Sequence, residues 1–364
     1  MEITDLLMAT HKNNASDLHL SAKNPPIMRV NGDMLQLDMP KLTGEEIKKM
    51  VYSVMTEQQR SDYENELELD FSISFTSDLR FRVNVFNTIY GAAAVFRNIP
   101  TKILSLEALG APEVLKRLCH LHKGLILVTG PTGSGKSTTL AAMVDYINAN
   151  FNKHILTVED PVEFVHAPKR SLINQREVGG STRSFAKALK SALREDPDVI
   201  LVGELRDLET IQLAMTAAET GHLVLGTLHT SSAPKTIDRI IDVFPADDKE
   251  MVRAMLSVSL EAVIAQTLVK RADGRGRVAA HEIMLGSPAI RNLIREAKVP
   301  QITSMIQMGS KLGMCLMRDS LNRLYEAGEI SAEALREILI TSAEEESNPA
   351  AQSSKRPLTN NSSF

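Results

Sequence analysis

This chain of 364 residues has few cysteines, no tryptophan and fewer basic than acidic residues. Its two cysteines, Cys119 and Cys315, lie far apart, which excludes a disulfide framework and a tetra-cysteine zinc site. Tryptophan is absent, aromatic residues make up 4%, and the net charge is -4, so we expect no nucleic-acid partner. No apolar run reaches the roughly 18 residues that span a bilayer, so we expect no transmembrane segment. These absences indicate an acidic, cytosolic protein with reduced thiols.

The length allows two domains of roughly 100–200 residues each. Residues 1–98 read as a small α+β unit, and residues 99–112 as a linker or hinge. Thr43 and Glu46 have the spacing of a capping box at a helix start. The other expected elements of the unit are a helix at residues 3–11, strands at 17–20 and 27–30, and a hairpin formed by 79–86 and 92–96.

Residues 113–342 show a different pattern, in which short and wholly apolar runs alternate with helical stretches. The runs are residues 125–128, 155–158, 199–202 and 223–228. Strands that are apolar on both faces are typical of a parallel sheet covered by helices, so we expect an α/β domain. From residue 288 to 342 the spacing of the apolar residues is that of helices. Residues 343–364 are rich in Ser, Asn and Pro and are expected to be a disordered tail.

A glycine-rich segment follows the first apolar run directly and matches the pattern GxxxxGK[ST]. The glycines let backbone N–H groups turn toward a phosphate, and the N-terminus of the next helix adds a partial positive charge. Lys136 is expected to reach the β- and γ-phosphates of ATP, and the Ser137 hydroxyl to coordinate Mg²⁺. The residues expected to bind the nucleotide are Gly130, Pro131, Thr132, Gly133, Ser134, Gly135, Lys136, Ser137 and Thr138.

Carboxylates follow two of the other apolar runs. Glu204 comes after residues 199–202, and Glu159, Asp160 and Glu163 come after residues 155–158. Because ligands of parallel α/β sheets bind outside the carboxyl ends of the strands, both groups are expected at the rim that holds the phosphate loop. The alternative for the second group is a solvated acidic loop, because loops at strand ends are usually polar and exposed. His229 ends the fourth run, where it can contact the γ-phosphate or a carboxylate.

These segments resemble the Walker A, Asp box, Walker B and His box of the secretion and pilus ATPases, the type II/IV secretion superfamily. They occur in that order at residues 130–137, 155–164, 196–207 and 220–230, and the likeness covers nearly the whole chain. The resemblance implies a RecA-like P-loop ATPase domain preceded by a smaller α+β, PAS-like domain. It also implies that Glu204, through water, and Ser137 hold Mg²⁺, and we favour Glu163 over Glu204 as the general base. The sequence leaves open which of Glu163 and Glu204 is the base.

A second motif narrows the resemblance to the pilus-retraction branch of this superfamily. Its residues are Ala289, Ile290, Arg291, Asn292, Leu293, Ile294, Arg295 and Glu296. Ile290, Leu293 and Ile294 lie on one helix face, and Arg291 and Arg295 lie one turn apart on the other side. An ordinary amphipathic surface helix would show the same pattern. The assembly branch carries an extra N-terminal domain and a tetra-cysteine zinc site. Two cysteines are too few for that zinc site.

The resemblance further implies a homohexamer whose N-terminal domains close on the nucleotide sites. Arg82, Arg97 and Arg239 match family arginines that approach the γ-phosphate. The implied partners are an inner-membrane platform protein of the pilus, reached from the cytoplasm, and an accessory retraction ATPase. The alternatives are a pilus-assembly or type II secretion ATPase, an accessory retraction paralogue, and a nucleotide-sensing scaffold that does not hydrolyse ATP. The combination of Lys136, Ser137, Glu163 and Glu204 argues against the scaffold.

Overall fold

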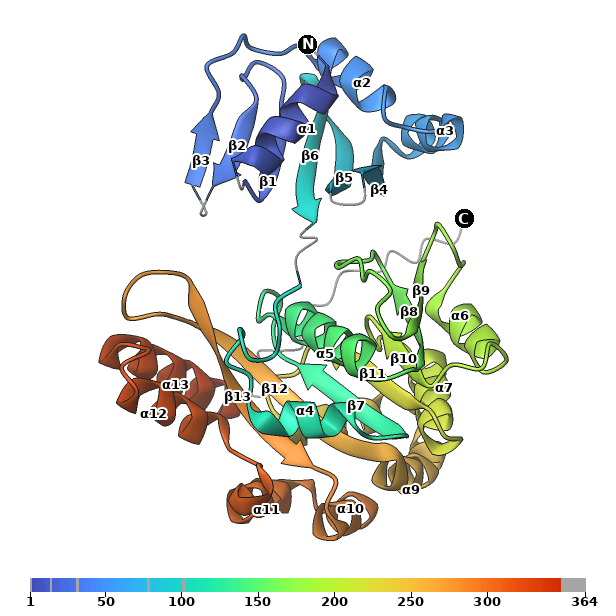
Figure 1. Ribbon diagram of the computed structural model, residues 1–364, viewed down its shortest axis with the longest axis vertical. Coiled ribbons are helices and arrows are strands. Elements are labelled where there is room, and N and C mark those ends of the chain that lie inside the picture. The colour runs from blue at the N-terminus through green and yellow to red at the C-terminus, as the bar shows by residue number, and fades with distance from the viewer. Residues whose placement is uncertain (1, 14, 31–32, 77–78, 100–102, 348–364) are drawn as a thin grey trace. The chain divides into compact units, whose positions relative to one another are not determined.

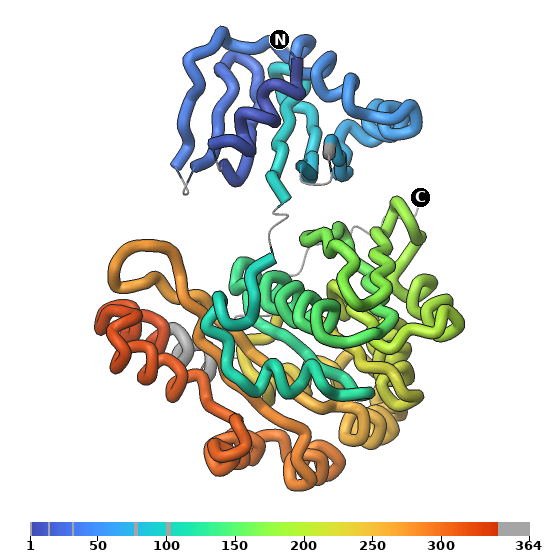
Figure 2. Tube along the Cα trace, in the orientation of Figure 1, coloured from blue at the N-terminus to red at the C-terminus, as the bar shows by residue number. Residues whose placement is uncertain are grey.

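The computed structural model describes residues 2–13, 15–30, 33–76, 79–99 and 103–347 (Figures 1 and 2). Residues 100–102, near the start of the expected linker, and residues 348–364 of the expected tail lie outside this part. Contacts divide the chain into two units. The first comprises Met1–Ile103 with Glu159–Ala167, and the second comprises Leu104–Val158 with Pro168–Phe364. Each unit has its own sheet and core.

The first unit contains a six-stranded antiparallel sheet with the strand order β3-β2-β1-β6-β5-β4. Apolar side chains of the first two helices pack on one face of this sheet. The elements are α1 (Ile3–Lys12), β1 (Asp17–Leu20), β2 (Ile27–Val30), β3 (Asp33–Gln36), α2 (Gly44–Tyr52), α3 (Glu57–Glu66), β4 (Glu68–Thr76), β5 (Leu79–Thr88) and β6 (Gly91–Ile99).

The sequence pattern of the first unit predicted most of these elements. The helix at the start, the strands β1 and β2, and the β5–β6 hairpin are confirmed, with the hairpin longer at both ends. The capping box also forms, since the Thr43 hydroxyl accepts from the Glu46 N–H and the Glu46 carboxylate accepts from the Thr43 N–H. Along β5 the side chains of Phe81, Val83 and Val85 are fully buried, which leaves Arg82 on the opposite face.

The second unit contains a seven-stranded sheet with the order β13-β12-β7-β11-β10-β8-β9. Strands β12, β7, β11, β10 and β8 run parallel, and β13 is antiparallel to β12. Its elements are α4 (Glu113–Cys119), β7 (Gly124–Thr129), α5 (Lys136–Asn150), β8 (His154–Glu159), β9 (Leu172–Glu177), α6 (Phe185–Ala192), β10 (Val199–Val202), α7 (Leu208–Glu219), β11 (Leu223–Leu228), α8 (Ala233–Asp242), α9 (Lys249–Ser259), β12 (Leu260–Lys270), β13 (Arg277–Leu285), α10 (Pro288–Arg295), α11 (Ile302–Met308), α12 (Met317–Glu326) and α13 (Ala332–Ser347).

Helices cover both faces of this sheet, which explains why its strands are wholly apolar (Figure 1). Along β7, Leu125 and Leu127 pack in a cluster with α7, α8 and α9, whereas Ile126 and Val128 pack in another with α4 and α5. Each strand therefore needs apolar side chains at successive positions. The expectation of an α/β domain with a smaller α+β unit before it is confirmed.

Two features of the second unit differ from the sequence expectation. The β12–β13 hairpin was not anticipated; it extends the sheet beyond β7 and adds an antiparallel edge. Helix α13 runs to Ser347, past residue 343, where the tail was expected to begin. Among the described residues, no helix is both long and apolar enough to cross a membrane.

Candidate active site

The phosphate loop joins β7 to α5 in the order that the motif requires. Gly130, Gly133 and Gly135 have φ angles of 142°, 79° and 87°, a region that glycine enters without steric cost. Gly135 is the N-cap of α5, so no side chain caps this helix, and its first turn holds no acidic residue. The helix therefore presents its first N–H groups and its positive end to the loop, as an anion site requires.

Three further groups in and beside the loop suit a phosphate. Lys136 is buried, and its Nζ donates to the carbonyl oxygens of Gly130 at 2.8 Å and Pro131 at 3.0 Å. The hydroxyls of Ser134 and Thr129 are buried and have no hydrogen-bond partner. Buried hydroxyls are normally satisfied, so these two are consistent with a polar ligand at the loop. Ser137 and Thr138 follow in the first turn of α5 and are half-buried.

Glu204 lies just beyond β10, at the edge of the sheet where β7, β8 and β11 also end. One carboxylate oxygen lies 2.6 Å from Arg206 Nη2, and the other lies 3.2 Å from His229 Nε2. Burial opposes ionisation of Glu204, but the hydrogen bonds and charges of Arg206 and His229 outweigh it, so the pKa of the carboxyl lies below its usual value. Glu204 is thus ionised at neutral pH and joined to the His box.

Glu163 belongs to the first unit, together with Arg82 and Arg97. Its carboxylate is exposed, and its backbone N–H donates to the Glu159 carboxylate at 3.3 Å. Arg82 makes a two-pronged contact with Asp70, and this hydrogen bond raises the pKa of the guanidinium, with smaller contributions from Asp160 and Glu163. The acidic segment after β8, Glu159–Ala167, therefore belongs to the same unit as the sheet that carries Arg82 and Arg97.

The two hairpin arginines lie side by side on the same face of the sheet, because Arg82 on β5 is the register partner of Arg97 on β6. Arg97 Nε donates to the buried carboxylate of Asp17 at 2.9 Å, while the Arg97 side chain remains 66% exposed. Arg239 lies on α8 and is exposed. The arginines are thus positioned on open surfaces of their own units, and their role at a phosphate stays a prediction.

Helix α10 carries the motif of residues 289–296, and its two arginines have different environments. Ile290 and Ile294 are buried, as their spacing predicted, and Arg295 is exposed. Arg291 differs from the expectation of a surface arginine. Its guanidinium donates to the carbonyl oxygens of Gly286, Ser257 and Val258 and to the Glu261 carboxylate, all at 2.6–2.8 Å. Arg291 therefore holds the end of α9 and the start of β12 against α10.

The structure adds two residues that the sequence pattern did not indicate, both on the β12–β13 hairpin. Gln266 is buried and bonds to the phosphate loop and to α5. Glu282 is buried, and its carboxylate accepts from the N–H of Ala233 at the start of α8, four residues after His229. In the sequence, each of them is only a polar residue within an apolar stretch. Without the fold, nothing identifies the group that each one contacts.

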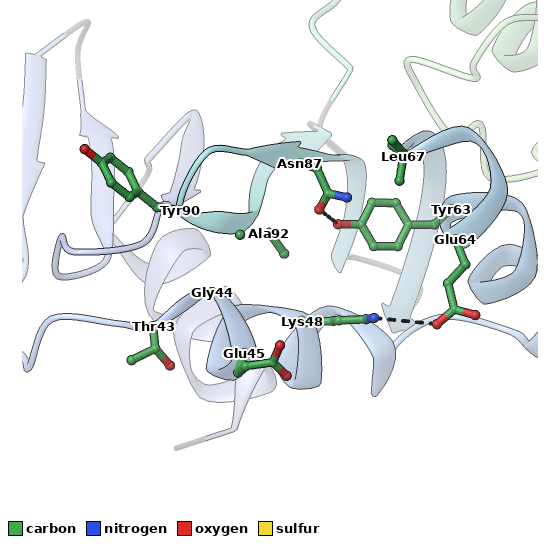
Figure 3. Close-up of a pocket in the computed structure, with 11 residues that line it drawn as sticks. Thr43, Gly44, Glu45, Lys48, Tyr63, Glu64, Leu67, Asn87, Tyr90 and Ala92 are labelled. Atoms are coloured by element: carbon green, nitrogen blue, oxygen red, sulfur yellow. Dashed lines mark hydrogen bonds and ion pairs between the residues drawn. The ribbon is translucent and has the colours of Figure 1, made fainter.

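The described residues also line a cavity of about 520 Å³ in the first unit, between α2, α3 and the β5–β6 hairpin (Figure 3). Polar groups in its wall satisfy one another: the Tyr63 hydroxyl donates to Asn87 at 2.6 Å, and Lys48 lies 3.6 Å from Glu64 (Figure 3). This cavity contains none of the expected nucleotide-binding residues. The phosphate loop is the stronger candidate, because the buried hydroxyls of Ser134 and Thr129 lack a partner that a ligand would supply.

Comparison with known proteins identifies the family. A profile described as "Type II/IV secretion system protein" matches residues 2–336. The chain belongs to this family. It is 60% identical to the type IV pilus retraction ATPase PilT of Pseudomonas aeruginosa, over 93% of this chain and 98% of that protein. It is also 60% identical to a twitching motility protein of Neisseria gonorrhoeae, over 85% and 83% of the two chains.

The solved structure of a pilus retraction motor PilT with bound ADP has the same fold. It superposes with a TM-score of 0.87 at 48% identity and covers 93% of this chain and 96% of that one. Family membership confirms the resemblance drawn from the four ordered motifs. It also confirms the RecA-like ATPase domain with a smaller N-terminal domain.

Proposed function

We propose that this protein is an ATPase motor that powers the retraction of type IV pili and so drives twitching motility. The observation that carries the proposal is the 60% identity to PilT over nearly the full length of both chains. The motif on α10 lies within the aligned length and is the feature by which the sequence resembles the retraction branch. Retraction would remove pilin subunits into the membrane while the protein acts from the cytoplasmic face.

The phosphate loop suits ATP, and the buried hydroxyls and uncapped helix described above support this fit. Residues 130–138 would hold the phosphates, with Lys136 turning from its loop carbonyls to the β- and γ-phosphates. Ser137 would coordinate Mg²⁺, and Glu204 would hold its water ligands. Mg²⁺, when bound, neutralises charge that develops on the phosphate oxygens. Within the described residues, no group of three or more His, Cys, Asp or Glu side chains is placed to hold a metal by itself.

The environments of the two carboxylates favour different roles. Glu204 is paired with Arg206 and His229, which lower its pKa and make it a weak base. A carboxylate fixed in the ionised form is suited to orienting water around a cation. Glu163 is exposed, so an attacking water can reach its carboxylate. We therefore assign Glu163 as the general base and Glu204 as the Walker B residue, with His229 holding Glu204 in place.

Arg82, Arg97 and Arg239 would supply positive charge to the γ-phosphate as the domains close, because Lys136 does not reach every phosphate oxygen. Closure of an N-terminal domain in a homohexamer, with residues 99–112 as the hinge, would couple hydrolysis to movement. The load would be an inner-membrane platform protein, and an accessory retraction ATPase could share it. Placement at the inner-membrane base of the pilus follows from this assignment.

Two measurements test the proposal. The purified wild-type chain should hydrolyse ATP in the presence of Mg²⁺. A strain that lacks the gene should carry an excess of surface pili and should not twitch. A strain without pili would instead assign the protein to pilus assembly, and normal twitching would exclude a role as the main retraction motor.

A further inference from the structure

One buried side chain connects the phosphate loop to a strand far away in the sequence. Gln266 lies on β12, the neighbour of β7, and its side chain is 3% exposed. Its Nε2 donates to the backbone carbonyl of Ser134 at 2.7 Å, and its Oε1 accepts from the Thr139 hydroxyl at 2.7 Å. The carbonyl can only accept, so the orientation of the amide is fixed by its partners.

The two contacts lie on either side of residues 135–138, the last four of the residues that would meet the phosphates. Ser134 precedes Gly135 and Lys136 in the loop, and Thr139 lies in the first turn of α5. The Gln266 amide therefore spans the point where the loop becomes the helix. Because the loop has no side-chain cap of its own, this amide is a tether that keeps the backbone N–H groups pointing in one direction.

The same residue also explains two of the loop glycines. A Cβ on Gly130 would come within 2.3 Å of the Gln266 backbone carbonyl, and a Cβ on Gly135 within 2.9 Å of its Nε2. By contrast, a Cβ on Gly133 would meet nothing within 4 Å. The loop is thus pressed against Gln266 at two of its three glycines, and the third is needed only for its backbone angle.

We propose that Gln266 is a positioning residue for the nucleotide: its side-chain amide holds the phosphate loop in the shape that binds the phosphates. The inference rests on the proposed function, because it concerns the same site. Gln266 does not take part in the chemistry. It acts through Ser134 and Thr139, so its loss should lower nucleotide affinity by more than the accompanying loss of stability explains.

The decisive variant is Gln266→Leu, which keeps most of the volume and removes both hydrogen bonds. We expect the Kd for Mg·ADP and the KM for ATP to rise about tenfold or more, since small displacements of binding groups are costly. Gln266→Glu keeps the acceptor for Thr139 but loses the donor to Ser134, and it should show the same loss. Thr139→Val removes only the hydroxyl and should produce a smaller rise in the same direction.

Ser320→Ala is the matched control. The Ser320 hydroxyl is buried and accepts from the N–H of His281, which is the register partner of Gln266 on β13. This variant removes a buried hydrogen bond from the same hairpin without contacting the loop. We expect its unfolding temperature to fall about as much as that of Gln266→Leu, while its Kd for Mg·ADP stays within twofold of the wild type.

The outcomes separate the two proposals. Wild-type affinity in both Gln266 variants, with an active wild type, would overturn the positioning role and leave the proposed function intact. An equal loss of affinity in Ser320→Ala would assign the effect to general destabilisation and would also overturn it. If Gln266→Leu does not fold, unchanged affinity in Thr139→Val would count against the proposal. A wild type that neither binds Mg·ADP nor hydrolyses ATP would overturn both.

Discussion

Arg291 provides a direct test of how the motif on α10 works. Its guanidinium makes four contacts, with the carbonyl oxygens of Gly286, Ser257 and Val258 and with the Glu261 carboxylate. Ser257 and Val258 lie in the last turn of α9, where carbonyl groups lack partners within the helix and favour a cation. The arginine thus satisfies backbone groups that its removal would leave partly unpaired.

The magnitude follows from the number and exposure of these contacts. A hydrogen bond that involves a charged group contributes about 1.5–3 kcal/mol, but the Arg291 side chain is 23% exposed, so water can replace part of what is lost. We therefore expect Arg291→Ala to lower the free energy of unfolding by about 2–4 kcal/mol. For a unit of this size the unfolding temperature would fall by roughly 5–15 °C.

The assay compares Arg291→Ala with Arg295→Ala by thermal unfolding, ATP turnover and twitching. Arg295 is exposed, so its substitution should change stability by less than about 0.5 kcal/mol. We expect Arg295→Ala to keep ATP turnover and lose retraction. Arg291→Lys keeps the charge without the forked donor and should recover only part of the stability. The reasoning is refuted if Arg291→Ala unfolds within one or two degrees of the wild type.

Three further variants test the site and the fold. Glu204→Ala should keep ADP binding and ring formation but lose hydrolysis by orders of magnitude, and near wild-type turnover would remove it from the Walker B position. Glu163→Gln should lower kcat by about 10²–10⁴ with little change in nucleotide affinity, as for the loss of a general base, whereas a change in affinity alone would point to binding. Burial, aided by the charge of Arg323, lowers the pKa of His281 to about 4, so the native state resists protonation. Below pH 6.5 the unfolded chain takes up a proton on His281 that the native state does not. The free energy of unfolding therefore falls by about 3 kcal/mol between pH 6.5 and pH 4. The stability difference between the wild type and His281→Gln, followed by chemical unfolding, should shift by that amount over this window, and a constant difference would contradict the low pKa.

Hydrophobic periodicity was sufficient to predict the elements whose burial follows a simple rule. The four wholly apolar runs became β7, β8, β10 and β11, because helices cover both faces of their sheet. The hairpin of the first unit followed from alternation along β5. The phosphate loop was predictable because its function depends on backbone angles that glycine permits and on one lysine at a fixed spacing.

The β12–β13 hairpin could not be predicted by the same rule. Its strands combine apolar residues with buried polar ones, among them Gln266, His281 and Glu282, so the apolar run at residues 262–265 is interrupted and neither strand alternates cleanly. The side chains of Gln266 and Glu282 and the backbone N–H of His281 each have a hydrogen-bond partner elsewhere in the fold. The partner of Gln266 in α5 lies 127 residues away in the sequence, beyond the range of any local pattern.

Gln266 and Arg291 were missed or misplaced for one physical reason. Both bind backbone carbonyl oxygens, and a carbonyl is present at every residue, so these contacts leave no mark in the sequence. A functional segment can therefore depend on two kinds of polar residue: one meets the ligand or partner, and another fixes the backbone that presents it. On α10 we expect the exposed Arg295 to have the first role, and the contacts of Arg291 with backbone carbonyl oxygens fit the second. At the phosphate loop the same division separates Lys136 from Gln266, and nucleotide affinity and stability measured side by side will distinguish the two kinds of residue.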